Sequence, residues 1–138
     1  MIGRWVRMLA ASVVGDPAPM PSRLLDLFPE LSSIRLRRGG LLVRVAGWLI
    51  GHRTAAGITL WRTVIVAPDE RPSAGLLLHE LRHLQQFQED RLFPLRYLLE
   101  TLRRGYTNNR YERDAVRFAR ERLTVSGGEH DLHDIGHF

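Results

Sequence analysis

Two histidines separated by three residues, with a glutamate directly after the first, constrain this chain more than any other feature. The run is His79-Glu80-Leu81-Arg82-His83. Residues four apart on a helix share one face, with Cβ atoms about 5–6 Å apart, so both imidazoles can reach one tetrahedral metal ion. The neighbouring glutamate can then address a water on that metal, and chance predicts only about 0.01–0.02 such matches in a chain of this composition. The alternative is a helix that carries two surface histidines by coincidence.

The remaining composition limits how a metal can be held and which partners are expected. The chain has 138 residues, which predicts one domain, and no cysteine, which leaves histidine, carboxylate and water as ligands. Its formal net charge is +5, and all 20 basic side chains are arginines, spread from Arg4 to Arg122. A basic chain can bind nucleic acid or anionic membranes. Because no block of five or six charges occurs, we expect no clear nucleic-acid partner and keep such a domain as an alternative.

The N-terminal segment, residues 1–21, carries Arg4 and Arg7 followed by the short apolar run Met8–Val14. This pattern weakly resembles a signal peptide, but no clear small-residue cleavage site follows. We therefore expect a short helix packed on the domain, or extended chain, and a cytoplasmic protein, with secretion by a non-classical route left open. No stretch approaches the roughly 18 apolar residues that a membrane span needs.

Apolar periodicity and turn residues predict an α+β fold with a small sheet. The clearest strand covers Ile58–Ala67, which is rich in β-branched residues and stops at Pro68. Ser73 is the expected N-cap of the helix that carries the histidines and runs to about Asp90. The other predicted elements are a strand over 33–37 and helices over 23–28, 41–50, 95–104 and 109–125. Either Asn108 or Asn109 is the expected N-cap of the last helix. In the helix 95–104 we expect an inward face of four leucines: Leu95, Leu98, Leu99 and Leu102.

Glu112, in the last predicted helix, is the candidate third ligand. Two histidines hold zinc only weakly, and in His₂Glu sites the carboxylate comes from a separate helix. Glu112 shares its face with Ala115 and Ala119, whose small side chains allow another helix to approach closely. The alternative is a solvated acid in the first turn of its helix, favoured by the helix dipole. Beside the His79–His83 helix we favour ligation.

These two motifs resemble those of small bacterial zincin domains in which glutamate is the third ligand, the gluzincins. The matching segments are His79-Glu80-Leu81-Arg82-His83-Leu84-Gln85-Gln86 and Asn109-Arg110-Tyr111-Glu112-Arg113-Asp114-Ala115. The resemblance covers about residues 58–125 and implies a single compact zincin-like domain over 22–128. In that domain the strand preceding the histidine helix is an edge strand that binds an extended peptide, and two further helices follow the histidine helix.

The resemblance also implies a function. The protein would be a zinc-dependent metallopeptidase acting on peptide or protein substrates, with Zn²⁺ held by His79, His83 and Glu112, and Glu80 as the general base for a zinc-bound water. One departure concerns the aspartate that larger gluzincins place four residues after the ligand glutamate, because this chain has Val116 there. The orientation of the histidines must therefore come from another group.

A donor that stabilises the transition state is also expected. Tyr106 and Tyr111 are candidates by their proximity in sequence, although Tyr111 also suits core packing and Tyr106 a loop. Residues 129–138 form a histidine-rich tail, which is either a flexible polar terminus or a second metal-binding tract.

Two other functions stay open. Because a domain this small offers only a shallow cleft, it could be a weakly active or inactive zinc-binding zincin domain that serves as an interaction or assembly module. The other is the basic nucleic-acid-binding domain. The sequence specifies neither the preferred substrate nor the oligomeric state.

Overall fold

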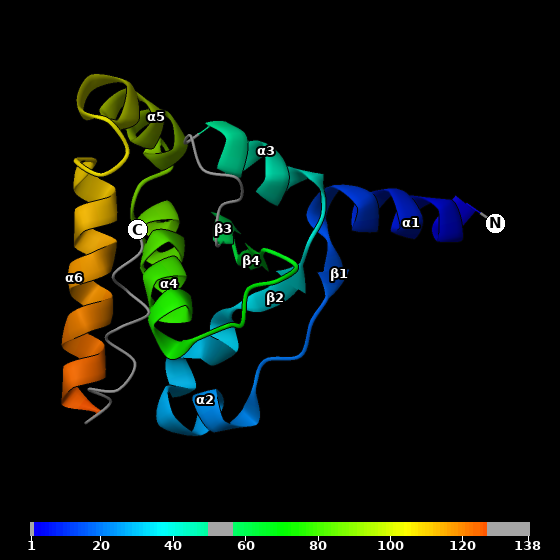
Figure 1. Cartoon of the computed structure of the whole chain (residues 1–138), viewed down its shortest axis with the longest axis horizontal. Helices are drawn as coiled ribbons and strands as arrows, with labels where there is room; N and C mark the ends of the chain where they lie inside the picture. Colours follow the sequence, from blue (N-terminus) through cyan, green and yellow to red (C-terminus); the bar gives the residue numbers. More distant parts are fainter. Residues whose placement is uncertain (1, 50–56, 127–138) are drawn as a thin grey trace. The chain divides into compact units, whose positions relative to one another are not determined.

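The computed structural model describes residues 2–49 and 57–126, and the chain divides into two compact units, Met1–Arg71 and Pro72–Phe138 (Figure 1). The described residues form six α-helices and a four-stranded mixed sheet, which confirms the predicted α+β class. The sheet belongs to the first unit, and the helix with the two histidines belongs to the second.

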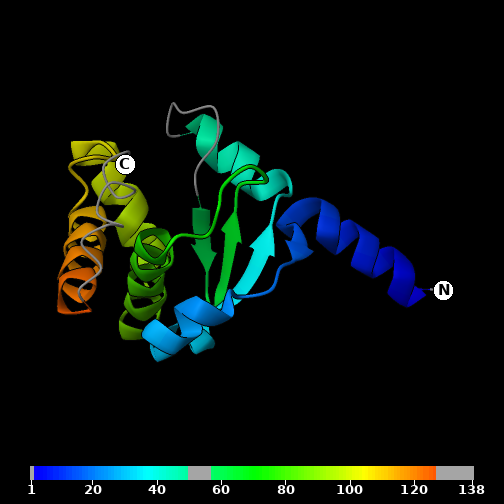
Figure 2. The same cartoon turned by 60° about the horizontal axis from the view of Figure 1, so that its bottom comes forward.

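The sheet of the first unit has the strand order β1-β2-β4-β3 (Figure 2). Its strands are β1 (Asp16–Pro17), β2 (Arg35–Arg38), β3 (Gly57–Leu60) and β4 (Thr63–Val66). Strands β2 and β4 run parallel, and the other two pairs are antiparallel. The helices of this unit are α1 (Ile2–Val14), α2 (Ser22–Leu27), the 3₁₀ helix η1 (Pro29–Ser33) and α3 (Leu41–Leu49). Val43 of α3 packs with Ile65 and Ala67 in a buried apolar cluster.

The predicted single strand over Ile58–Ala67 is wrong, because the chain reverses at Trp61 and forms a hairpin. Leu60 pairs with Thr63 across a two-residue turn, and Trp61 has a left-handed φ of 52°. Two-residue hairpin turns favour Asn and Gly at such positions, and this turn carries Trp and Arg, so the sequence lacks the usual signal. The consequence is that β3 lies at the edge of the sheet, whereas β4 is paired on both sides.

Helix α1 begins earlier than the apolar run that predicted it, and the expected packing on the domain is wrong. None of its described residues is buried. Only its last turn is held: Val14 packs against the Val43 cluster, and the Arg37 guanidinium donates two hydrogen bonds to the Gly15 carbonyl, at 2.9 and 2.7 Å. Gly15 has a φ of +78°, and a Cβ there would lie 2.3 Å from the Arg38 carbonyl oxygen, so only glycine fits this contact.

The second unit contains α4 (Ala74–Glu89), α5 (Phe93–Arg104) and α6 (Arg110–Val125), with α4 and α6 side by side (Figures 1 and 2). The Ser73 hydroxyl accepts a hydrogen bond from the Leu76 N–H at 3.1 Å, which confirms the predicted N-cap of α4. Asn109, one of two predicted candidates, caps α6 through the Tyr111 N–H. Ala115 and Ala119 are completely buried, as close approach of a neighbouring helix requires.

The predicted inward face of α5 is wrong. The side chains of Leu95, Leu98, Leu99 and Leu102 are 49 to 74 % exposed. The opposite face is turned inward: Phe93 is buried, and its ring contacts those of Tyr97 and Tyr111. Aromatic rings bury more area per residue than leucine and gain from edge-to-face contacts, which accounts for the choice of this face over the leucine stripe.

Candidate metal centre

Three buried side chains of the second unit meet at one point. His79 and His83 project from α4, four residues apart, and Glu112 projects from the first turn of α6. The Nε2 atom of His79 lies 3.0 Å from Glu112 Oε2, and that of His83 lies 3.1 Å from Glu112 Oε1. The two Nε2 atoms are 3.1 Å apart. The three predicted ligand side chains are therefore brought together from two helices.

The spacing of these atoms suits a tetrahedral metal ion. Zinc binds histidine nitrogen and carboxylate oxygen at about 2.0–2.2 Å, and tetrahedral geometry then places neighbouring ligand atoms about 3.3 Å apart. The observed separations of 3.0 to 3.1 Å are close to that value. Only a small outward movement of the side chains would be needed to admit the ion.

Gln86 determines which nitrogen of His83 faces the three-residue cluster. The Gln86 amide nitrogen donates to the Tyr111 carbonyl at 3.2 Å and to Asp114 Oδ2 at 3.0 Å, so the amide oxygen is left facing His83. That oxygen lies 2.8 Å from His83 Nδ1, which must therefore carry the proton of the contact. A neutral His83 consequently directs the lone pair of Nε2 towards His79 and Glu112, as a metal ligand requires.

Electrostatics favour a carboxylate and a cation at this point. Burial would raise the pKa of Glu112, but hydrogen bonds from His79 and His83 outweigh it and hold the pKa well below its usual range. Burial would lower the pKa of His83, but the hydrogen bond and the charge of Glu112 raise it from 6.5 to about 9. Without a metal, a proton on His83 therefore supplies the positive charge that the ionised Glu112 requires.

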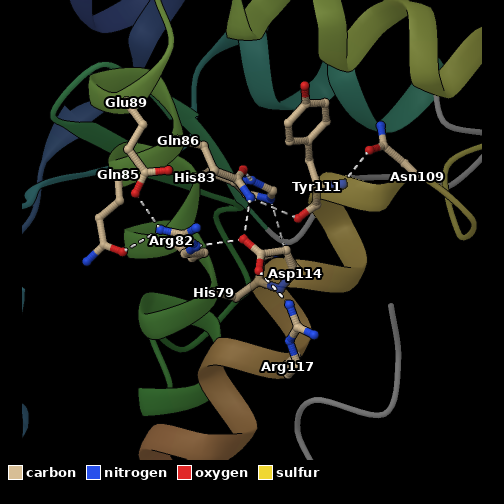
Figure 3. A network of polar contacts seen from close by, with 10 residues as sticks. All are labelled: His79, Arg82, His83, Gln85, Gln86, Glu89, Asn109, Tyr111, Asp114 and Arg117. Carbon is tan, nitrogen blue, oxygen red and sulfur yellow. Dashed lines mark hydrogen bonds and ion pairs between the residues drawn. The ribbon is translucent and has the colours of Figure 1, made fainter.

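A polar network extends from Gln86 to the surface of the unit (Figure 3). Asp114 accepts from Gln86 and also from Arg82 Nε, at 2.6 Å, and Arg82 in turn donates to Glu89 at 2.9 Å. Asp114 thus acts on His83 through Gln86, although it does not touch the imidazole itself. This network orients His83 without the aspartate that was expected at the position of Val116.

Tyr97 of α5 is a site residue that the sequence did not indicate. Its hydroxyl donates to Glu112 Oε1 at 2.5 Å. Burial, together with the charge of Glu112, raises the pKa of Tyr97, so its hydroxyl stays protonated and remains a donor. The side-chain amide of Asn109 donates to the Tyr97 carbonyl at 3.1 Å and thereby ties α5 to the start of α6. No local pattern points to Tyr97, because leucines dominate the periodicity of its helix.

The two predicted tyrosine donors have different surroundings. Burial, followed by the charges of Glu112 and Glu80 and a hydrogen bond with Glu112, raises the pKa of Tyr106. Tyr106 therefore lies at the cluster as a protonated donor. The Tyr111 hydroxyl accepts from Arg110 at 2.8 Å and points away from Gln86 and Asp114 (Figure 3). The structure thus brings Tyr106, and not the hydroxyl of Tyr111, to the candidate ligands.

Glu80, the predicted general base, is buried beside the cluster and is not one of its three members. Its negative charge contributes to raising the pKa of His83, of Tyr97 and of Tyr106. The Glu80 carboxylate is therefore within electrostatic range of both tyrosines and of one imidazole.

A hollow of about 270 Å³ reaches Glu112 from the surface. Its wall contains three arginines of α6, spaced so that they share one face of the helix, together with residues from the α5–α6 loop. The lining residues besides Glu112 are Tyr106, Thr107, Arg113, Val116, Arg117 and Arg120. The hollow therefore gives access to a ligand and to Tyr106 along a cationic wall.

No other group of three or more potential ligand side chains occurs within residues 2–49 and 57–126. The histidine-rich tail (129–138) and His52 lie outside the described residues. Comparison with protein-family models, curated protein sequences and solved structures gives no match to this chain. In the described part of the chain, no helix has the length and apolar character to cross a bilayer.

Proposed function

We propose that this protein is a zinc-dependent metallopeptidase. The observation that carries the proposal is the buried triangle of His79, His83 and Glu112 atoms, with the buried Glu80 directly after His79 in the same helix. Two imidazoles and one carboxylate form a ligand set that catalytic zinc sites use, with the fourth position left to water or substrate. The site geometry and the sequence motif are what support this assignment.

The donor set fits zinc in chemistry as well as in spacing. Gln86 holds His83 in the tautomer that directs Nε2 to the cluster. Tyr97 supports a second ligand, Glu112, through a hydrogen bond to its carboxylate. When bound, zinc supplies a Lewis acid that polarises a carbonyl group and increases the acidity of water.

Glu80 and Tyr106 have distinct roles in the proposed reaction. The Glu80 carboxylate accepts a proton from the attacking water and passes it to the nitrogen of the leaving amine. Tyr106 lines the hollow and keeps its proton, so its hydroxyl is the candidate donor to the oxygen of the cleaved carbonyl. The arginines of the hollow favour a peptide that presents a carboxylate beside the bond that is cleaved.

The test combines metal analysis with turnover. The purified chain should contain about one zinc and should cleave members of a fluorogenic peptide library that includes acidic and neutral sequences. Glu80→Gln should keep the zinc and the fold but lower the cleavage rate at least about a hundredfold, since a positioned acid–base group contributes about 10²–10⁴. Equal rates for Glu80→Gln and the wild type would refute the assigned role of Glu80.

A second candidate is a zinc-binding module without catalysis. It is favoured by one observation: the hollow is lined by Glu112 and Tyr106, whereas Glu80 is not among its lining residues. If the zinc-loaded wild type cleaves no peptide in the library and no unfolded protein, this second function replaces the first. The zinc content alone does not separate the two.

A further inference from the structure

Helix α1 presents a stripe of large apolar side chains to solvent. Five residues spaced at i, i+3, i+4, i+7 and i+11 fall on one face of a helix with 3.6 residues per turn. Their side chains are 41 to 81 % exposed, and they are Ile2, Trp5, Val6, Leu9 and Val13. Contiguous apolar surface of this kind marks an interaction site in a folded protein.

The other side of the helix carries two cations and no anion. Arg4 and Arg7 project on the side opposite the stripe, and α1 contains no acidic residue. The first acidic residue of the chain is Asp16, beyond the end of the helix. The charge of α1 therefore complements an anionic surface.

The helix is fixed to its own unit at one end. The Gly15 carbonyl accepts two hydrogen bonds from Arg37, and a Cβ on Gly40 would lie 2.4 Å from the Gly15 nitrogen, so the two backbones are in close contact. Beyond this anchor, α1 extends away from the sheet of the unit (Figure 1). Its apolar stripe is thus an exposed face of an ordered helix.

We propose that α1 lies in the surface of an anionic lipid bilayer, with the stripe of Ile2, Trp5, Val6, Leu9 and Val13 towards the acyl chains. Amphipathic helices with Trp and Leu on one face and arginine on the other bind in this plane, and anionic headgroups attract the arginines. At about 1.5 Å per residue, its 13 residues extend about 20 Å, short of the roughly 30 Å hydrocarbon core, so the helix lies along the surface.

A second copy of the chain suits this face less well. Stable protein interfaces engage about 20–30 residues on each side, and the stripe contains five. Pairing two α1 helices would also bring their arginines together without an acidic partner in either helix. The proposal does not depend on the peptidase assignment, whose residues all belong to the other unit.

The experiment measures sedimentation of the full chain with vesicles. Vesicles of phosphatidylcholine mixed with phosphatidylglycerol should pellet the wild type at low salt, and phosphatidylcholine alone or high salt should pellet much less. Val6→Glu/Leu9→Glu should lower the bound fraction roughly tenfold or more. The matched control is Leu27→Glu/Val125→Glu, which makes the same charge change at exposed apolar positions outside α1 and should bind nearly as the wild type does.

Two further measurements test the role of the arginines and the depth of Trp5 in the bilayer. Arg4→Gln/Arg7→Gln leaves the apolar stripe intact and should remove the preference for anionic vesicles. In a Trp48→Phe/Trp61→Phe background, Trp5 is the only tryptophan, and its emission should shift to the blue and be quenched by brominated lipids when vesicles are added.

The proposal is overturned if the wild type fails to pellet with anionic vesicles, or if the control pair loses binding as strongly as the α1 pair. Light scattering that shows a wild-type dimer, dissociated by Val6→Glu/Leu9→Glu, without vesicle binding would assign the stripe to a second copy. Zinc content is measured in all variants. If it is unchanged, a loss of vesicle binding is not caused by failure of the metal site.

Discussion

The surroundings of His83 suit two states of its side chain, the charged partner of Glu112 and the neutral metal ligand. Its Nδ1–H is fixed by the Gln86 amide oxygen, and its Nε2 faces Glu112 and His79. With a pKa of about 9, the metal-free residue is charged at neutral pH and forms an ion pair with Glu112. Loss of one proton, from Nε2, turns the same side chain into a ligand without any rotation of the ring.

Gln86 should matter for metal affinity although it is not a ligand. Gln86→Leu removes the acceptor that holds the His83 tautomer and leaves the Asp114–Arg82 pair in place. Loss of such a supporting group typically costs 10- to 100-fold in metal affinity, and competition with a chelating dye would measure it. Gln88→Leu, an exposed position on the same helix, is the matched control and should bind zinc as the wild type does. Wild-type affinity in Gln86→Leu would contradict this role.

Zinc binding at pH 7 should release about one proton, because zinc must displace the proton on His83 Nε2. In the metal-free protein the raised pKa contributes stability that is fully present below 6.5 and is lost as the pH rises through about 9. Zinc affinity should change in the opposite sense and increase as the pH rises through this window. Calorimetry in buffers of different ionisation enthalpy counts the protons, and a binding heat that is independent of the buffer would contradict the prediction.

At the scale of whole elements, the site depends on how closely α4 and α6 approach each other. Glu112, Ala115 and Ala119 are all buried on one side of α6, and both alanines have no exposed surface. A larger side chain at either alanine has no space to occupy. The third side of the site is provided by α5, whose Tyr97 reaches Glu112 because its aromatic face, and not its leucine face, is turned inward.

Ala119→Leu should therefore destabilise the protein and separate the two helices. Overpacking in a filled core typically costs about 1–3 kcal/mol in the free energy of unfolding, which urea titration followed by circular dichroism would measure. Zinc affinity should fall in parallel, because Glu112 moves away from the imidazoles. Val125→Leu, at an exposed position of the same helix, should leave both quantities unchanged. Unaltered stability of Ala119→Leu would mean that α4 and α6 are not in close contact.

At the scale of the molecule, the two compact units contain different features. The first unit has the sheet and the exposed helix α1, and the second has the candidate metal centre. Because all three candidate ligands belong to the second unit, the proposed metal would act on the stability of that unit.

Zinc should raise the thermal midpoint of the intact chain. A ligand that binds only the folded state adds about 2.7 kcal/mol of stability at a free concentration one hundred times its dissociation constant. Differential scanning calorimetry with and without a chelator would measure the shift. His79→Ala should abolish it, and a chelator-sensitive midpoint that persists in this variant would place the stabilising metal elsewhere.

The sequence by itself determined what depends on local geometry. The spacing of His79 and His83 follows from the helical repeat alone, the N-caps Ser73 and Asn109 are short-range signals, and the α+β class follows from hydrophobic periodicity. The small face of Ala115 and Ala119 also allowed Glu112 to be selected as the third member of the cluster. Each of these patterns involves residues a few positions apart, whereas the contact of Glu112 with the histidines joins two helices.

Only the tertiary structure decided which faces and turns prevail. The leucines of α5 and the aromatic residues opposite them form two competing faces, and contacts of Phe93 and Tyr97 with other rings select between them. The reversal at Trp61 is stabilised by pairing of β4 with both neighbours, which no local residue pattern reports. Tyr97 reaches Glu112 across 15 positions of sequence. Such contacts depend on long-range packing, whose free energy is not encoded in the spacing of neighbouring residues.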